Sequence, residues 1–238
     1  IKSDIKNVKD YHTFKIKNGR VYTDYVENVS VISGNNLIDE VSYQQISGEL
    51  KKPADNIVLK KGTPAIKKKF KGRVLTIVQG ASGNTYGHWL LEMLPKIKMC
   101  SEHYPLKNID YFYTPHLTDF QKETLSVLDI NENKIINSKK YRHIQADELL
   151  AVTHPSYYEG YILEQFKFQP TWIIKWLRET YLPHKKSFLA GKKIFLDRTD
   201  SLNNHCQFVN EKEVSEYMTK EKGFVKYQLT KLTFFEKV

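Results

Sequence analysis

The chain has 238 residues, of which 40% are hydrophobic and 27% charged, so it can bury the core of one large domain or two smaller ones. No apolar run approaches the roughly 18 residues of a membrane-spanning helix, and two cysteines are too few for a disulfide framework or a cysteine-based metal site. The sequence starts at Ile1 and not at methionine, so it gives no information on targeting signals. Its low cysteine content favours a reducing compartment. We expect a cytoplasmic protein, with peripheral attachment to the inner face of the membrane as the alternative.

Most of the net positive charge comes from one segment. The formal net charge is +10, and residues 51–73 contribute +8 of it through eight lysines and Arg73 against the single Asp55. Such a segment can contact nucleic acid, anionic lipid headgroups or an acidic glycan, or it can be a solvated loop. No RNP-like, zinc-finger or helix-turn-helix signature accompanies it, so we expect no nucleic-acid partner. An anionic membrane surface stays open as a partner of residues 51–73.

The first 72 residues have the pattern of a β-rich section. "YHTFKI" and "RVYTDYVENVSVI" alternate or are β-branched, and Asn18-Gly19 and Gly34-Asn35-Asn36 interrupt them, which predicts hairpin strands. From Arg73 onward, strands and helices alternate, which is typical of an open α/β layer. The elements expected there are strand 73–79, helix 86–102, strand 109–114, helix 118–129, strand 134–137 and strand 147–153.

A second unit is expected to begin near residue 185. Residues 170–182 predict an amphipathic helix that opens with Pro170 in its first turn. After it come one strand ending near Arg198, a helix over about 211–222 and the strand "FVKYQL". We therefore divide the chain into residues 1–185 and 186–238.

The stretch "QGASGNTYGHWLLEMLPKIKMC", residues 79–100, is the first candidate for a site. Gly80 and Gly83 follow a strand and precede a helix, where flexible backbone and unpaired N–H groups can hold a phosphate. Their spacing fits neither the dinucleotide-binding nor the P-loop pattern, so these glycines predict donor binding only weakly.

His88 and Glu92 lie one helical turn apart and therefore point the same way. They are either the wall of a site or a solvated helix edge. The spacing resembles half of a zinc-protease helix, but the second histidine is missing and we expect no metal. Pro95 in this helix removes a backbone hydrogen bond to Leu91 and predicts a kink.

Two motifs give the chain a resemblance to glycosyltransferase family 61. "NTYGHWLLEMLPKI" is similar to the family's N-terminal signature, and "KKIFLDRTDSLNNHCQFVNEKEV", residues 192–214, is similar to its strand–loop–helix element with N-E-x-E. The resemblance implies a GT-B-like, metal-independent, inverting transferase that needs no cofactor. It uses a nucleotide-sugar donor and a glycan or glycolipid acceptor, in bacteria commonly for capsule or lipopolysaccharide, and hexosyl and pentosyl transfer both stay open.

The resemblance also implies roles for individual residues. Glu92 matches the family's carboxylate and is the candidate base, with His88 orienting the acceptor or the carboxylate. Arg198 is expected to hold the donor diphosphate, assisted by Asn210 and Glu211 at the start of the next helix. For Asn210 and Glu211, helix capping alone is the other interpretation. The candidate acceptor-binding residues are Trp89 and Lys96.

The expected fold is thus α/β, with a Rossmann-like N-terminal lobe, preceded by the β-rich section 1–72 and followed by an incomplete second lobe. Relatives continue beyond the point where this sequence ends at Val238, so we expect the donor site of residues 186–238 to be incomplete. A non-catalytic glycan- or membrane-surface-binding module is the alternative function. A half-built sheet leaves an open edge, so residues after 185 are expected to dock on the first lobe or to associate with a second copy of the chain.

Overall fold

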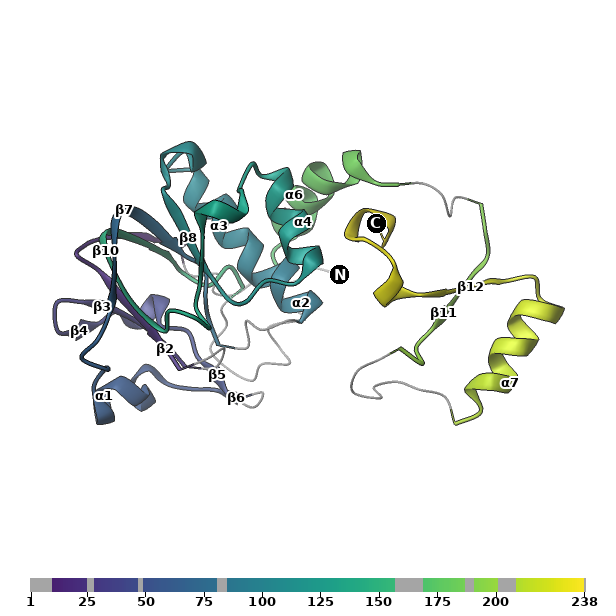
Figure 1. Cartoon of the computed structure of the whole chain (residues 1–238), viewed down its shortest axis with the longest axis horizontal. Coiled ribbons are helices and arrows are strands. Elements are labelled where there is room, and N and C mark those ends of the chain that lie inside the picture. The colour runs from purple at the N-terminus through teal and green to yellow at the C-terminus, as the bar shows by residue number, and fades with distance from the viewer. Residues whose placement is uncertain are drawn as a thin grey trace.

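The computed structural model describes residues 10–24, 28–46, 49–80, 85–156, 169–186, 191–200 and 209–237 (Figure 1). It confirms a mixed α/β protein with a large central sheet covered by helices. The sheet has eight strands in the order β4-β3-β2-β10-β7-β8-β9, with β1 also paired to β10. The strands are β1 (Thr13–Lys17), β2 (Arg20–Thr23), β3 (Val29–Ser33), β4 (Asn36–Leu37), β7 (Lys68–Thr76), β8 (Tyr111–Thr114), β9 (Ile135–Asn137) and β10 (His143–Val152).

The opening strands correct one prediction and confirm another. β1 and β2 do not form a hairpin at Asn18-Gly19, because both pair antiparallel with β10 along the same side, one after the other. Asn18 has a φ of 53°, and a Cβ on Gly19 would lie 2.6 Å from the Leu149 Cβ, so the chain bends here while staying close to β10. The expected hairpin at Gly34-Asn35 is present between β3 and β4.

The four strands β10, β7, β8 and β9 run parallel and carry the core on both faces. Side chains alternate across a strand, so Leu75 and Ile77 face the helical side, whereas Val74 and Val78 face the other cluster. β7 begins five residues before the expected start at Arg73. The first residues of β7 are lysines, so the hydrophobic pattern of the sequence does not show that a strand begins there. Pairing with β10 nevertheless extends β7 to these residues. Residues 51–73 are therefore not a single loop, since they also contain helix α1 (Ile57–Lys61).

Helices connect the parallel strands as expected. The principal ones are α2 (Tyr86–His88), the π-helical turn η3 (Trp89–Met93), α3 (Leu94–Ser101), α4 (Asp119–Val127) and α6 (Thr171–Tyr181). Short elements complete this part: η1 (Asp39–Val41), β5 (Gln45–Ile46), β6 (Glu49–Leu50), η2 (Pro53–Asp55), η4 (Leu106–Asn108), η5 (Glu132–Lys134) and η6 (Leu182–His184). Pro170 lies just before α6 and not within its first turn. The kink expected at Pro95 takes the form of a π-helical turn directly before α3. Pro95 therefore lies in the first turn of α3, where its missing N–H breaks no hydrogen bond of that helix.

The C-terminal residues form a small βαβ unit. β11 (Ile194–Asp197) pairs in parallel with β12 (Val225–Gln228), and α7 (Glu211–Glu216) with the turn η7 (Tyr217–Glu221) lies between them in the chain. Figure 1 shows β11, β12 and α7 apart from the large sheet. After β12 the chain continues through η8 (Leu229–Lys231) to α8 (Phe234–Lys237). Phe234 is buried in the core of the large unit, and its backbone N–H donates to Glu123 at 2.6 Å. The end of the chain thus docks on the first unit, while the division at residue 185 stays a prediction.

Candidate functional site

The carboxyl end of β7 leads into a tightly packed corner of the molecule. Gly80 donates its backbone N–H to the Tyr43 carbonyl at 2.9 Å, and a Cβ at this position would lie 1.9 Å from the Gln45 nitrogen. The close backbone approach that the sequence predicted for a donor phosphate is therefore made by residues 44–45 of the chain itself. Gly83 lies outside the described residues.

Glu92 is the centre of a buried polar cluster. Its side chain is 0% exposed, and one carboxylate oxygen, Oε1, lies 2.7 Å from Nδ1 of His88. The other oxygen, Oε2, accepts a hydrogen bond from Gln79 Nε2 at 2.6 Å and lies 3.2 Å from His154 Nε2. The structure thus brings together the two residues expected to face the same way, and adds Gln79 and His154 from the ends of β7 and β10.

The hydrogen bonds of His154 define its tautomer. The backbone N–H of Ser156 donates to His154 Nδ1 at 3.2 Å, which assigns the ring proton to Nε2. This nitrogen lies 3.2 Å from Glu92 Oε2 and 3.3 Å from the Gln79 amide nitrogen, and of these two atoms only the carboxylate oxygen can accept. Burial lowers the pKa of His154, which favours the neutral ring, and the ring stacks on Tyr43 with centroids 4.1 Å apart. His154 therefore holds the carboxylate in place through a neutral N–H donor.

Glu92 is ionised at neutral pH. Burial alone would raise its pKa, but the hydrogen bonds from His154 and His88 outweigh burial and lower the pKa to about 2. Because a carboxylate can only accept, the His88 proton lies on Nδ1, and in the neutral ring the lone pair then lies on Nε2. The role of base stays a prediction for Glu92, whose fully buried carboxylate contacts His88, His154 and Gln79.

Lys96 lies one turn beyond Glu92 on α3 and is 3% exposed. Burial lowers the pKa of its ammonium group to about 7, although the charge of Glu92 acts in the opposite direction. Within the part of the chain that the structure describes, Lys96 has neither an ion-pair partner nor a hydrogen-bond acceptor. A buried ammonium group in this state is costly and is typical of ligand sites more than of cores.

Further polar atoms in this corner lack partners among the described residues. Both amide atoms of Gln44 are buried without a hydrogen bond, as are Oε1 of Gln45 and Oε1 of Gln79. The Gln44 backbone packs against Gly80, next to Gln79 in the chain, so these amides lie around the same corner. Unpaired buried donors and acceptors of this kind require water or a hydroxyl-rich ligand.

Trp89 does not lie where an acceptor could contact it, which corrects the sequence-based expectation. Its side chain is 0% exposed within the core cluster, and its indole N–H donates to Thr124 Oγ1 at 2.9 Å. The π-helical turn directs Trp89 into the core while Glu92 faces the ends of β7 and β10.

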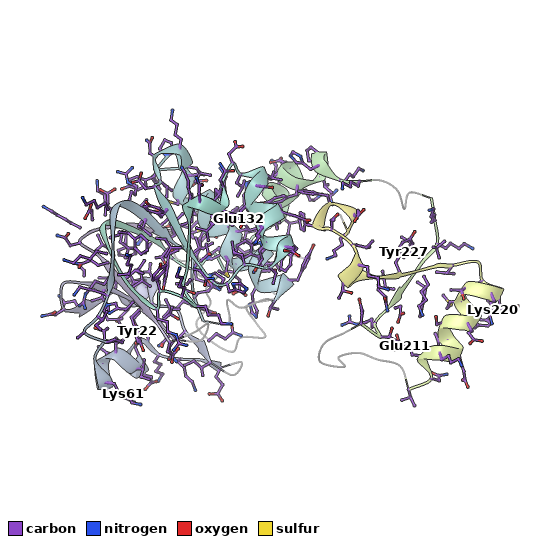
Figure 2. All side chains as sticks on the ribbon, in the orientation of Figure 1. Tyr22, Lys61, Glu132, Glu211, Lys220 and Tyr227 are labelled. Carbon is purple, nitrogen blue, oxygen red and sulfur yellow. The ribbon has the colours of Figure 1, made fainter. Side chains whose placement is uncertain are left out.

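Arg198, Asn210 and Glu211 form a second group, on the β11–α7 unit. Glu211 Oε1 accepts the backbone N–H of Arg198 at 3.1 Å, and Figure 2 shows Glu211 at the end of α7 away from Lys220. Asn210 precedes α7 but its side chain caps nothing. Its amide instead lies 3.4 Å from Glu213, so the capping interpretation of Asn210 is wrong. Sequence reasoning also missed Asp197, which is 2% exposed and ion-paired with Lys226 at 2.9 Å.

The structure does not bring the two groups together. No hydrogen bond or ion pair between described residues links the Glu92 cluster with Arg198 or Glu211, and Figure 1 places α7 far from α2.

The comparison with protein families identifies the chain. The profile described as Glycosyltransferase 61 matches residues 86–238, which is more than half of the sequence. The chain belongs to glycosyltransferase family 61. Membership indicates glycosyltransferase activity, and hence a sugar donor and an acceptor. No curated protein and no solved structure matches the chain.

The family 61 match covers His88, Glu92, His154 and Arg198, whereas Gln79 and residues 43–45 precede it. Gln79 and His154 were missed by sequence reasoning although a signal existed. Each is a polar residue two or three positions after a buried strand, and parallel strands β7 and β10 end at the same edge of the sheet.

Among the described residues, no group of three or more His, Cys, Asp or Glu side chains has the arrangement of a metal site. None of the described helices has the length and apolar character needed to cross a membrane.

Proposed function

We propose that this family 61 member transfers a sugar with inversion from a nucleotide-sugar donor to a glycan or glycolipid acceptor, without a metal ion, in surface-polysaccharide synthesis on the cytoplasmic side. A GT-B-like arrangement is part of the proposal, with the large sheet as the acceptor-side lobe and the β11–α7–β12 unit as part of the donor side. The parallel β11–β12 pair with its intervening helix supports the second assignment.

The contact between His88 and Glu92 carries the mechanism. Nδ1 of His88 donates to the ionised carboxylate, so Nε2 can take the proton of the acceptor hydroxyl. As that proton moves to Nε2, the acceptor oxygen forms its bond to the anomeric carbon and the bond from that carbon to the diphosphate breaks. Glu92 stays ionised, fixes the tautomer and stabilises the imidazolium that forms.

The buried polar groups around this pair fit a sugar ring. A carbohydrate hydroxyl both donates and accepts, which matches the unpaired amide atoms of Gln44 and Gln79 and the ammonium group of Lys96. We assign these groups to the acceptor. Arg198, which is exposed beside Glu211, is the cation proposed for the donor diphosphate.

A screen of nucleotide-sugar donors tests the proposal. Wild-type chain, His88→Asn and the control His103→Asn are incubated with each donor and a panel of glycan acceptors, and product is measured. His103 is exposed in the turn that follows α3 and lies outside the cluster. We expect His88→Asn to lose at least about 100-fold in turnover. The donor should protect wild type and His88→Asn equally against heat.

A metal-chelation arm completes the test. Transfer should continue in EDTA, and a loss that manganese restores would refute metal independence. Equal turnover of His88→Asn and wild type would remove His88 from the mechanism. Glycan binding that is indifferent to every nucleotide sugar, without any product, would favour the alternative of a non-catalytic glycan-binding module.

A further inference from the structure

A lysine-rich surface lies away from the candidate site. Residues 57–69, here called the lysine patch, have the sequence "IVLKKGTPAIKKK", with five lysines and no acidic residue. Two aliphatic side chains within it are largely exposed, Ile66 at 89% and Leu59 at 56%. Figure 2 shows Lys61 at the outer edge of the large unit, away from the unit that carries Glu211 and Lys220.

The lysine patch is held on an ordered scaffold. Asn56 is buried before α1, where its side chain accepts from Val58 N–H and from Ser30 Oγ. The segment after α1 is fixed by the Pro64 carbonyl, which lies 2.8 Å from His143 Nδ1. Arg20 also contacts Thr63 at 3.4 Å and adds another positive charge beside the patch. The exposed lysines and aliphatic side chains are therefore presented by a supported surface.

Ion pairs with described residues do not neutralise the charges of the lysine patch. None of its five lysines forms an ion pair with an acidic residue in the described part of the chain. The neighbouring Lys51 and Arg73 differ, because they are paired with Glu49 and Glu148. A surface with these positive charges favours an anionic partner.

We propose that the lysine patch docks the protein on a bilayer that contains anionic lipids, with Ile66 and Leu59 entering the headgroup layer. Exposed aliphatic side chains among lysines match an interface that is charged outside and apolar below. Recognition of nucleic-acid bases instead uses arginine forks and stacked aromatic rings, whereas exposed aliphatic side chains contribute little to phosphate contacts. Phe70, which follows the patch in the chain, packs against Tyr111 and Tyr141. This inference does not depend on the transferase proposal.

Vesicle sedimentation tests the docking with the full chain. Wild type is mixed at about 0.1 M salt with vesicles of phosphatidylcholine alone, or with about one third phosphatidylserine added, and the bound fraction is measured. We expect binding to the anionic vesicles only, and its loss at about 1 M salt, where the screening length falls to about 3 Å.

Matched variants distinguish binding through the lysine patch from binding that depends only on the net charge of the protein. The triple variant Lys60→Gln, Lys61→Gln, Lys67→Gln should bind about 100-fold more weakly, because each lysine near an anionic surface contributes about five-fold. The control removes three exposed lysines elsewhere, as Lys107→Gln, Lys139→Gln, Lys192→Gln, and should keep most of the binding. Ile66→Ser should weaken binding at least about five-fold if the side chain enters the bilayer.

Three results would overturn the inference. Wild type that does not sediment with anionic vesicles has no such surface, and equal losses in the two triple variants would reduce the effect to net charge. Unchanged binding of Ile66→Ser, together with tighter binding to single-stranded RNA or heparin at the same salt, would show a general polyanion surface. Circular dichroism of each variant checks that the fold is kept.

Discussion

Replacing Lys96 by methionine should make the protein more stable, because it removes a buried ammonium group and keeps most of the side-chain volume. Lys96 is 3% exposed, and burial lowers its pKa from 10.5 to about 7. A difference of about 3.5 units corresponds to about 5 kcal/mol of unfavourable free energy at neutral pH. Relaxation and water penetration reduce this number, so we expect Lys96→Met to raise the free energy of unfolding by about 2 to 5 kcal/mol.

The gain should depend on pH in a defined direction. Between the folded pKa of about 7 and the unfolded value of 10.5, the unfolded chain binds one more proton at Lys96, so wild-type stability rises with pH there. Below pH 7 the lysine is charged in both states and its full cost is present. The advantage of Lys96→Met is therefore largest at pH 7 or below and shrinks towards pH 10.

Thermal unfolding followed by circular dichroism measures this effect. For a chain of this size, 2 to 5 kcal/mol corresponds to a rise in Tm of about 4 to 20 °C. The control is Lys98→Met on the same helix, which removes a more exposed lysine paired with Glu102 and should change stability by less than about 1 kcal/mol. A Lys96→Met protein with unchanged or lower Tm, or with an advantage independent of pH, would refute the assignment of Lys96 as an uncompensated buried cation.

Three further changes follow from the contacts described above. Glu92→Gln should lower the free energy of unfolding in urea by about 3 kcal/mol and abolish transfer, because its amide N–H₂ would face other hydrogen-bond donors. We expect wild type to lose stability as pH falls from 4.5 towards 2, where Glu92 becomes protonated, and Glu92→Gln to lack this loss. The same acid profile in both proteins would contradict the buried carboxylate. Arg198→Ala should weaken binding of a nucleoside diphosphate, measured by calorimetry, more than Arg198→Lys does, because the planar fork makes two parallel contacts; equal losses would indicate a structural arginine. Phe234→Ala should destabilise the large unit by about 3 kcal/mol, more than the partly buried control Phe235→Ala, and similar melting of the two variants would argue against docking of α8.

Local patterns in the sequence determined most of the helices and parallel strands, because hydrophobic period and turn residues act over a few neighbours. The same local reasoning placed His88 and Glu92 on one face, since i and i+4 positions of a helix meet without help from the rest of the chain. It also located the π-helical irregularity through Pro95, whose missing N–H is a property of the residue itself.

Tertiary packing determined which groups those residues contact and how deeply they are buried. Glu92 contacts His154, which lies 62 positions away, and this contact exists only because β7 and β10 end side by side. The burial of Lys96, the docking of Phe234 on the first unit and the pairing of both β1 and β2 with β10 likewise depend on partners distant in sequence. Periodicity shows that a side chain faces inward or outward but not which groups it meets, and the pKa of a carboxylate is set by those groups. For that reason the sequence alone indicated Glu92 as a base, whereas the contacts of the folded chain lead us to propose His88 in that role.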